Sequence, residues 1–359
     1  MIAKDNLPFR TVENEGFQYL LKTTTPLYKI PGRKSITNLM EDKYELLSMV
    51  AKLKLSTTDA VTLTTDVWTD TLNTRSYLGV TAHFVSEDKL ESVTIGVTLL
   101  EERHTAEYLG EWLLQICTEW RITKEQVVAV VTDNGANILK AITDSFGKHK
   151  HLSCFAHTLN LVASKLIDEE STVRVTCDKV KALVTFFKQS VVAADELRKY
   201  TEKRLIQSVP TRWNSTYFML DRFIELSENV GAVLLKFPQS PSMLLASELQ
   251  FAKETVQVLK PVEAASREAC GQVYVTPSKV IPLNTNCLRN KIKELDLLTS
   301  AGIKLRELLL ANFDKRFGKV EYITFSLSRR SWTQGSKNCI FITHSRTRKQ
   351  YKRLRRKCK

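Results

Sequence analysis

The chain has 359 residues, with 53 Lys and Arg against 39 Asp and Glu, so its formal net charge is +14. Its 43% hydrophobic residues, with only 12 Gly and 9 Pro, are enough for a sizeable core and exclude the disordered, collagen-like and disulfide-scaffold classes. No apolar run approaches the roughly 18 to 20 residues that span a bilayer, and seven scattered Cys without a CxxC pair favour a reducing compartment, nuclear or cytoplasmic.

The first half of the chain predicts an α/β unit. Residues 1–60 predict an irregular arm followed by a helix, because prolines and a glycine precede apolar residues at helical spacing. Apolar residues then alternate over 61–68, 78–84 and 93–99, which predicts an antiparallel meander with a loop at 69–76. A helix with Thr105 as its N-cap follows, and the apolar run 127–131 predicts a strand covered on both faces. This strand is expected to lie parallel to the first one.

The second half predicts helices. Apolar stripes at helical spacing cover 173–191, 218–233, 244–259 and 303–313, with expected interruptions at Pro238, Pro241, Pro261, Pro277 and Pro282. The helical pattern fails near residue 320. Residues 329–359 hold 12 Lys and Arg and no acidic residue, so residues 1–328 carry a net charge of only +2. The basic character therefore belongs to a tail.

Two aspartates are associated with the ends of the two strands that are expected to be parallel neighbours. Asp66 lies near the end of the first strand and Asp133 just past the buried one, so both should emerge at the carboxyl edge of the sheet. Such carboxylates repel each other unless a cation lies between them, and Mg²⁺ or Mn²⁺ there can activate water for phosphodiester cleavage. The alternative is an ordinary strand-end residue at Asp66 and a helix N-cap at Asp133.

The group His149, His151, Cys154 and His157 suggests zinc only weakly. A structural zinc site needs a second ligand pair at defined spacing, which the other Cys do not supply, so we do not expect zinc in this chain. Cys154 and His157 flank a predicted strand-to-helix junction. There a buried Cys and a hydrogen-bonded His are ordinary structural residues.

Two further groups of residues are candidates for binding nucleic acid. Arg212 and Trp213 place a cation beside a large aromatic ring, which can hold a phosphate and stack a base, although Trp213 can equally be a core anchor. In the tail, Arg353, Arg355 and Arg356 belong to a basic cluster that suits nuclear import or a grip on polyanions, against the alternative of a solvated terminus without a role. The sequence has no phosphate-binding glycine loop, nucleophile elbow or dinucleotide fingerprint, so kinase, hydrolase and dehydrogenase functions are not expected.

Four motifs in order resemble the hAT superfamily of DNA transposases, and most of all its zinc-finger BED domain-containing relatives. They are Asp66-Val67-Trp68-Thr69, Val131-Thr132-Asp133-Asn134-Gly135-Ala136-Asn137, Cys154-Phe155-Ala156-His157-Thr158-Leu159-Asn160 and Thr211-Arg212-Trp213-Asn214-Ser215. The resemblance covers about residues 1–318. It implies a lead-in arm at 1–60, an RNase H-like core at 61–170, an α-helical insertion at 171–318 and an irregular basic tail at 319–359.

The resemblance also implies roles for individual residues. Asp66 and Asp133 correspond to two members of the family's metal-binding acidic triad. Cys154 and His157 match a family motif near the end of the core strands, and Trp213 matches a tryptophan that stacks on a base when a hairpin forms at the cut end. DNA is the implied partner and the nucleus the implied location.

Three departures from the family pattern change the expected function. No paired Cys and His ligands of a BED zinc finger are present, and the acid-free tail resembles replaced sequence from a truncated or frame-shifted copy. The third acid of the family is a Glu in a C-terminal block that also supports homodimers of full-length relatives, and this sequence stops before that block. Glu254, Glu263, Glu268 and Glu321 are poor substitutes.

We therefore expect a transposase-like, nucleic-acid-associated protein whose catalytic core is incomplete and inactive. Two alternatives stay open. One is a non-enzymatic nuclear DNA-binding or regulatory module that uses the basic tail. The other is a metal-dependent nuclease of RNase H type that acts on a hybrid or structured nucleic acid.

Overall fold

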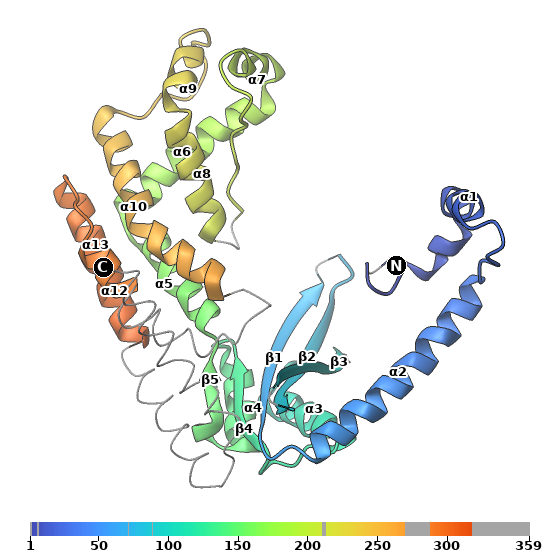
Figure 1. Ribbon diagram of the computed structural model, residues 1–359. Helices are drawn as coiled ribbons and strands as arrows, with labels where there is room; N and C mark the ends of the chain where they lie inside the picture. Colours follow the sequence, from blue (N-terminus) through green and yellow to red (C-terminus); the bar gives the residue numbers. More distant parts are fainter. Residues whose placement is uncertain are drawn as a thin grey trace.

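The computed structural model describes residues 2–5, 7–70, 72–87, 89–209, 213–269 and 288–317. Figure 1 shows three regions: an N-terminal arm, a sheet with helices on it, and a bundle of helices on the other side of the sheet from the arm. None of the described helices is both long and apolar enough to cross a membrane.

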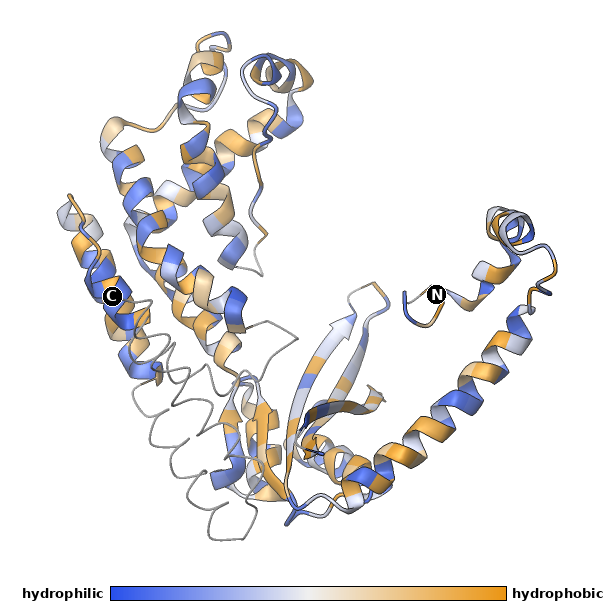
Figure 2. Cartoon of the chain, in the orientation of Figure 1, coloured by the Kyte–Doolittle hydropathy of each residue, from blue (hydrophilic) through white to orange (hydrophobic). Residues whose placement is uncertain are grey.

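The N-terminal arm is helical over most of its length. A 3-10 helix η1 (Phe9–Glu13) leads into α1 (Glu15–Thr24) and then α2 (Arg33–Ser56). The expectation of an irregular segment before the helix is thus wrong at α1, because no proline interrupts the ten residues that close its helical bonds. Only Ala51 and Leu55 of α2 are buried, at its C-terminal end. The rest of α2 extends away from the sheet, although hydrophobic residues recur along it (Figures 1 and 2).

The five-stranded sheet has the order β3-β2-β1-β4-β5. Its strands are β1 (Val61–Asp70), β2 (Arg75–Ser86), β3 (Lys89–Leu100), β4 (Val127–Thr132) and β5 (His151–Ser153). β1, β2 and β3 form an antiparallel meander, β4 is parallel to β1, and β5 is parallel to β4. This mixed sheet confirms the predicted meander and the predicted parallel neighbour of the first strand.

The first hairpin is longer than the sequence predicts. The ladder between β1 and β2 continues through Thr69 paired with Ser76 and Asp70 paired with Arg75, so the loop predicted at 69–76 is wrong. Polar residues at this end break the apolar alternation but not the backbone pairing. Their hydroxyl groups also interact across the strands, with Thr69 Oγ1 2.8 Å from Ser76 Oγ.

Two helices complete the core of the α/β unit. α3 (Ala106–Glu119) begins after Thr105, whose hydroxyl accepts a hydrogen bond from the Tyr108 N–H at 3.2 Å, as its predicted N-cap role requires. α4 (Ala136–Phe146) follows β4 and packs on α3. A short 3-10 helix, η2 (Lys148–Lys150), then leads to β5. The buried side chains of this core include Leu55, Leu63, Leu78, Val80, Phe84, Leu109, Leu113, Val130 and Ile142.

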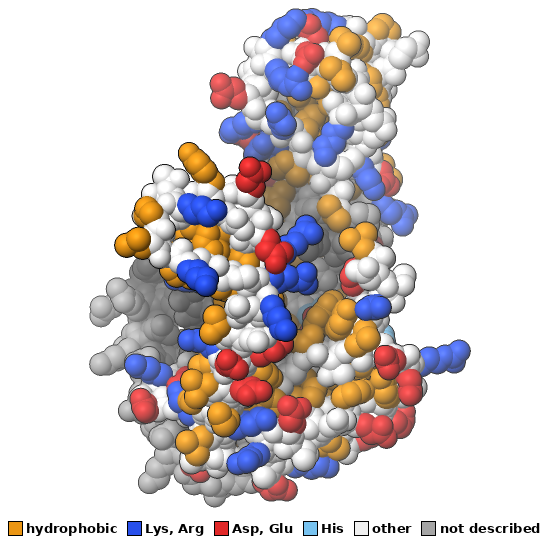
Figure 3. All heavy atoms as spheres, turned by 90° about the vertical axis from the view of Figure 1, so that its right-hand side faces the viewer, with side chains coloured by type: hydrophobic (Ala, Val, Ile, Leu, Met, Phe, Trp, Pro, Cys, Tyr) orange, Lys and Arg blue, Asp and Glu red, His pale blue; other side chains and the backbone are white. Residues whose placement is uncertain are grey.

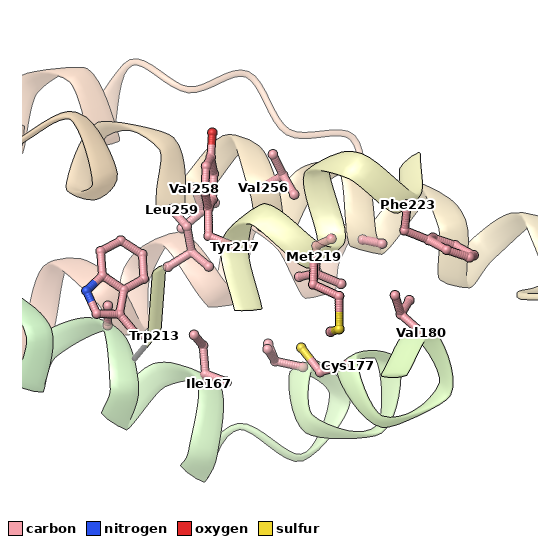
Figure 4. Close-up of a cluster of buried hydrophobic side chains, with 14 of the residues drawn as sticks. Ile167, Cys177, Val180, Trp213, Tyr217, Met219, Phe223, Val256, Val258 and Leu259 are labelled. Atoms are coloured by element: carbon pink, nitrogen blue, oxygen red, sulfur yellow. The ribbon is translucent and has the colours of Figure 1, made fainter. Parts of the chain in front are cut away.

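The helices that follow form a second hydrophobic core of their own. They are α5 (Phe155–Glu169), α6 (Ser171–Gln189), α7 (Val191–Arg198), α8 (Trp213–Glu225), α9 (Ser227–Leu234), α10 (Ala246–Ala269), α12 (Arg289–Lys293) and α13 (Ser300–Phe317). Their buried side chains cluster together, as Figure 4 shows for part of the set. The fold is therefore an RNase H-like mixed sheet with helices, followed by a helical domain.

α10 crosses a predicted break. Pro261 lies inside this helix, although the sequence predicts an interruption there. A proline inside a helix removes one backbone hydrogen bond and costs about 3 kcal/mol. The buried residues on both sides of it, Val258, Leu259 and Val262, supply hydrophobic contacts that offset this cost. Tertiary packing thus overrides the local signal. Pro277 and Pro282 lie outside the described residues.

Candidate functional site

Asp66 and Asp133 lie at the same edge of the sheet. β1 and β4 run parallel with Thr64 opposite Val131, and continuing this register by two residues places Asp66 opposite Asp133. Residues opposite each other on parallel neighbours point to the same face of the sheet. Asp133 follows the carboxyl end of β4, the kind of place where α/β sheets bind their ligands, whereas Asp66 lies within β1 and not near its end, because the strand continues to Asp70.

The surroundings of the two carboxylates leave oxygen atoms free. Asp66 is exposed, and its carboxylate has no hydrogen bond or ion pair within the part of the chain that the structure describes. Asp133 is half-buried and uses Oδ1 to accept the Gly135 N–H at 3.0 Å, with the Thr132 hydroxyl at 3.4 Å from the same atom. Asp133 is thus not the N-cap of α4, a position that Gly135 occupies.

Cys154 joins this edge from the next strand. β5 continues the parallel arrangement with Ser153 opposite Thr132, so Cys154 follows at the level of Asp133. The Cys154 N–H donates to the Thr132 carbonyl at 2.7 Å and extends the ladder by one bond before α5 begins. His157 lies in the first turn of α5, beside Thr158, whose hydroxyl is 3.5 Å from Asn134 Nδ2. The family motif therefore marks the junction between the sheet and the helical domain.

His151 contributes a buried titratable group close to this edge. It begins β5 opposite Val130, and its Nε2 atom is buried with no hydrogen-bond partner within the described residues. Burial lowers the pKa of His151, and the charge of Asp133 opposes this shift by raising it. A neutral imidazole is therefore favoured at physiological pH.

Trp213 lies in the core of the helical domain. It begins α8, and only 5% of its surface is exposed. Figure 4 shows its ring at one end of the cluster, near Ile167 of α5 and Leu259 of α10. In this structure the residue is the core anchor that the sequence left open as an alternative. A base could reach its ring only if these helices moved, so base stacking by Trp213 stays a prediction.

Several of the candidate residues from the sequence lie outside the described part of the chain, and the others have partners of their own. Arg212, Arg353, Arg355, Arg356 and Glu321 are not among the described residues. The buried Glu254 is engaged with the segment before α13, and Glu263 forms an ion pair with Arg267 at 3.4 Å. Over the described ranges, no group of three or more His, Cys, Asp or Glu side chains is arranged to hold a metal ion. The two aspartates thus have no third acid beside them there.

Trp68 is a residue of this edge that the sequence analysis left without a role. It lies two positions after Asp66 on the same strand, and therefore on the same face of the sheet. Its ring stacks on that of Tyr77, with the ring centres 5.6 Å apart and the planes at 23°. The spacing of two from Asp66 is a signal that could have placed it beside the site.

Two protein families match this chain in adjoining segments. The family described as the ZBED1 RNase-like domain matches residues 64–158, and the ZBED1 RNase-like helical domain matches residues 152–258. Together they cover the sheet, its helices and most of the helical domain. The chain belongs to the hAT transposase- and ZBED-related proteins that carry the ZBED1 RNase-like domains. This agrees with the fold and with the family expected from the four motifs.

Curated relatives of this hAT transposase-like chain include animal and plant proteins. It is 28% identical over 316 residues to the human zinc finger BED domain-containing protein 4, covering 82% of this chain and 26% of that protein. It is 31% identical over 241 residues to the putative AC transposase of Zea mays, and the match covers 61% of this chain and 29% of that protein. It is 27% identical over 336 residues to the Hobo transposase of Drosophila melanogaster, and the match covers 88% of this chain and 49% of that protein. The hAT transposase-like chain thus spans between a quarter and a half of the length of these relatives.

Proposed function

We propose that the RNase H-like core of this chain holds Mg²⁺ or Mn²⁺ between Asp66 and Asp133, binds DNA in the nucleus, and does not cut DNA on its own. The observation that supports the proposal is the parallel register of β1 and β4, in which Thr64 lies opposite Val131, two residues before Asp66 and Asp133. The relation to proteins named as transposases supports DNA as the partner.

The two carboxylates suit a hard divalent cation. Mg²⁺ prefers oxygen ligands, with one or two carboxylates and the rest supplied by water and phosphate. Asp66 and Asp133 offer oxygen atoms that take no other partner in the described part of the chain. A cation there would screen the repulsion between the two charges and, when bound, would activate water or stabilise a leaving oxygen in phosphodiester chemistry.

The proposed lack of strand cutting rests on the absence of a third acid beside the pair in the described part of the chain. Members of a catalytic unit act together, and the loss of one usually removes most of the rate. Asp66 and Asp133 can therefore bind a metal ion, and through it a phosphate, without cutting the DNA strand.

A metal-binding experiment tests the site itself. Titration of the protein with Mn²⁺, followed by calorimetry, should give binding that weakens about tenfold or more in Asp66→Asn and in Asp133→Asn, because each change removes one charged ligand. Asp42→Asn is the matched control, since Asp42 is an exposed carboxylate on α2. Equal Mn²⁺ affinity in the wild type and in both site variants would reject the site.

A cleavage experiment tests the proposed inactivity. Duplex DNA with terminal inverted repeats is incubated with the protein and Mg²⁺ or Mn²⁺, and the strands are separated on a denaturing gel. We expect no cutting. Strand cutting that Asp133→Ala abolishes would overturn the proposal and favour the nuclease alternative.

A further inference from the structure

The sequence contains a single Asn-Gly pair. Of its 12 glycines only Gly135 follows an asparagine, Asn134. The two residues lie in the short segment between β4 and α4, where Asn134 is exposed and lies at a bend of the backbone. An asparagine side chain can react with the backbone nitrogen of the next residue, and glycine hinders this approach least because it has no Cβ. Asn134 is therefore the asparagine whose neighbour leaves this reaction most room.

A carboxylate holds the backbone nitrogen that would attack. The Gly135 N–H donates to Asp133 Oδ1 at 3.0 Å. Gly135 is the N-cap of α4, so its carbonyl accepts from the Leu139 N–H at 3.0 Å, while its own N–H precedes the hydrogen bonds of the helix. A group that removes a proton has to lie within about 2.6 to 3.2 Å of the donor atom. Asp133 meets this requirement for the Gly135 nitrogen.

The amide of Asn134 is only loosely held. Its Nδ2 atom is 3.5 Å from the hydroxyl of Thr158 on α5. A contact of this length restrains the amide weakly, so the side chain can turn toward the Gly135 nitrogen. A Cβ at Gly135 would lie 3.1 Å from Asp133 Oδ1. Glycine thus leaves space both for the carboxylate on its N–H and for the amide that approaches it.

We propose that Asn134 is a site of spontaneous deamidation, with the Gly135 nitrogen as the nucleophile and Asp133 as the base. The Gly135 nitrogen gives its proton to Asp133 and bonds to Cγ of Asn134, and the Cγ–Nδ2 bond breaks. The departing nitrogen takes the proton from Asp133 and leaves as ammonia, so that a cyclic imide remains. Water then opens either C–N bond of the imide ring, which leaves aspartate or isoaspartate at this position.

Each event adds one negative charge to the protein. The new carboxyl group follows Asp133 directly in the chain, at a site where no third acid of the described residues joins Asp66 and Asp133. Water is the only co-reactant. The reaction therefore proceeds whether or not the site holds a metal ion or DNA, and its test is independent of the proposed function.

Mass spectrometry of the aged protein tests the proposal. The folded protein is kept at physiological pH and temperature, with a chelator, in water enriched in heavy oxygen. Replacement of the amide by a carboxyl group changes the mass of the peptide that contains Asn134, and the heavy oxygen marks events that precede digestion. Conversion should be about tenfold or more faster at Asn134 than at Asn137, which is also exposed but precedes the branched Ile138.

Three variants separate the groups that take part. Conversion should slow about tenfold or more in Gly135→Ala, because a Cβ obstructs the attack. It should slow about tenfold or more in Asp133→Ala, because only solvent then takes the proton. Asn134→Gln keeps the amide but places it farther from the Gly135 nitrogen, and its conversion should fall to the level of Asn137. Asp144→Ala removes an exposed carboxylate of α4 and is the control, with an unchanged rate expected.

Comparison with the urea-unfolded chain shows whether the fold promotes the reaction. Unfolding removes the fixed contact between Asp133 and the Gly135 N–H, so conversion should be at least as fast in the folded protein. Slower conversion in the folded protein would mean that the structure protects Asn134 and would overturn the proposal. An unchanged rate in Gly135→Ala or in Asp133→Ala would overturn it as well. Thermal melting verifies that each variant is folded.

Discussion

Glu254 is a buried carboxylate that accepts hydrogen bonds from the backbone just before a helix distant in the sequence. It is 1% exposed, and its Oε1 atom accepts the N–H groups of Leu298 at 2.9 Å and Thr299 at 3.1 Å, just before α13. Gln250 and the Thr299 hydroxyl complete its hydrogen bonds. A Cβ at Gly302 would clash with this carboxylate, so glycine is required there. The arrangement fixes α13 to α10.

Glu254→Gln should destabilise the protein in a pH-dependent manner. Burial raises the pKa of Glu254, but the hydrogen bonds from Thr299, Gln250 and the Leu298 N–H outweigh it and lower the pKa below its ordinary value of 4.5. A lowered pKa in the folded state contributes stability above pH 4.5, and this contribution is lost as the pH falls through the folded-state pKa. The variant should lose about 2 kcal/mol of unfolding free energy at pH 7, the scale of charge-assisted hydrogen bonds.

Urea unfolding at pH 7 and at pH 4 or below measures this difference. The difference in unfolding free energy between the wild type and Glu254→Gln should become smaller at the lower pH, because the protonated glutamate then resembles glutamine. A gap that stays constant over this range would show that the charge of Glu254 does not stabilise the fold.

The aspartate pair and the Glu254 contacts differ in how far the sequence reveals them. Asp66 and Asp133 are predicted to meet because Asp66 is expected near the end of one strand and Asp133 just past its parallel neighbour, so strand order and direction bring both to one end of the sheet. The hydrogen bonds of Glu254 join positions 44 and 45 residues apart in the sequence. No local pattern encodes such a pairing, which depends on how α10 and α13 pack. The burial of Trp213 depends on the packing of α5, α8 and α10 in the same way.

Among the elements, α2 shows a sharp contrast between its two ends. Leu55 is fully buried against the sheet core, whereas Leu46 is 59% exposed. Leu55→Ala should cost about 2 to 5 kcal/mol of unfolding free energy, because it leaves a cavity. Leu46→Ala should change the unfolding free energy by less than about 0.5 kcal/mol. Chemical denaturation of both variants gives the comparison, and similar costs would mean that the exposed end of α2 has a partner in the folded protein.

The sequence predicted elements best where one physical signal dominates. The meander, the buried strand β4 and the cap of α3 follow from alternation, continuous apolar residues and a capping hydroxyl. The errors occur where signals compete. The polar end of the first hairpin keeps its ladder although the apolar pattern stops, and α10 continues through Pro261 because its neighbours are buried. In both places, contacts with other elements outweigh the local preference.

At the scale of the whole molecule, the positive charge is unevenly distributed. Residues 329–359 contain 12 basic and no acidic side chains, while the remainder carries a net charge of +2. The face of the molecule in Figure 3 shows Lys and Arg interspersed with Asp and Glu. Non-specific DNA affinity through phosphate contacts should therefore depend mainly on the C-terminal segment.

Deletion of residues 329–359 tests this expectation. The affinity of the full chain for duplex DNA should fall steeply with salt. In a plot of the logarithm of the binding constant against the logarithm of the salt concentration, the slope should become shallower by about 0.9 for each phosphate contact that the deletion removes. Fluorescence anisotropy at several salt concentrations provides the slopes. Unchanged affinity and slope in the shortened chain would place the phosphate contacts elsewhere.

The outer strand β3 also has a consequence for handling the protein in solution. Its twelve residues border the sheet, and no described strand pairs with their far side. Uncovered backbone donors and acceptors can recruit an extended segment from another molecule, which leads to aggregation. The register shift between Val80 and Thr81 interrupts the regularity of this border, and Lys89 and Glu91 add charge near its beginning.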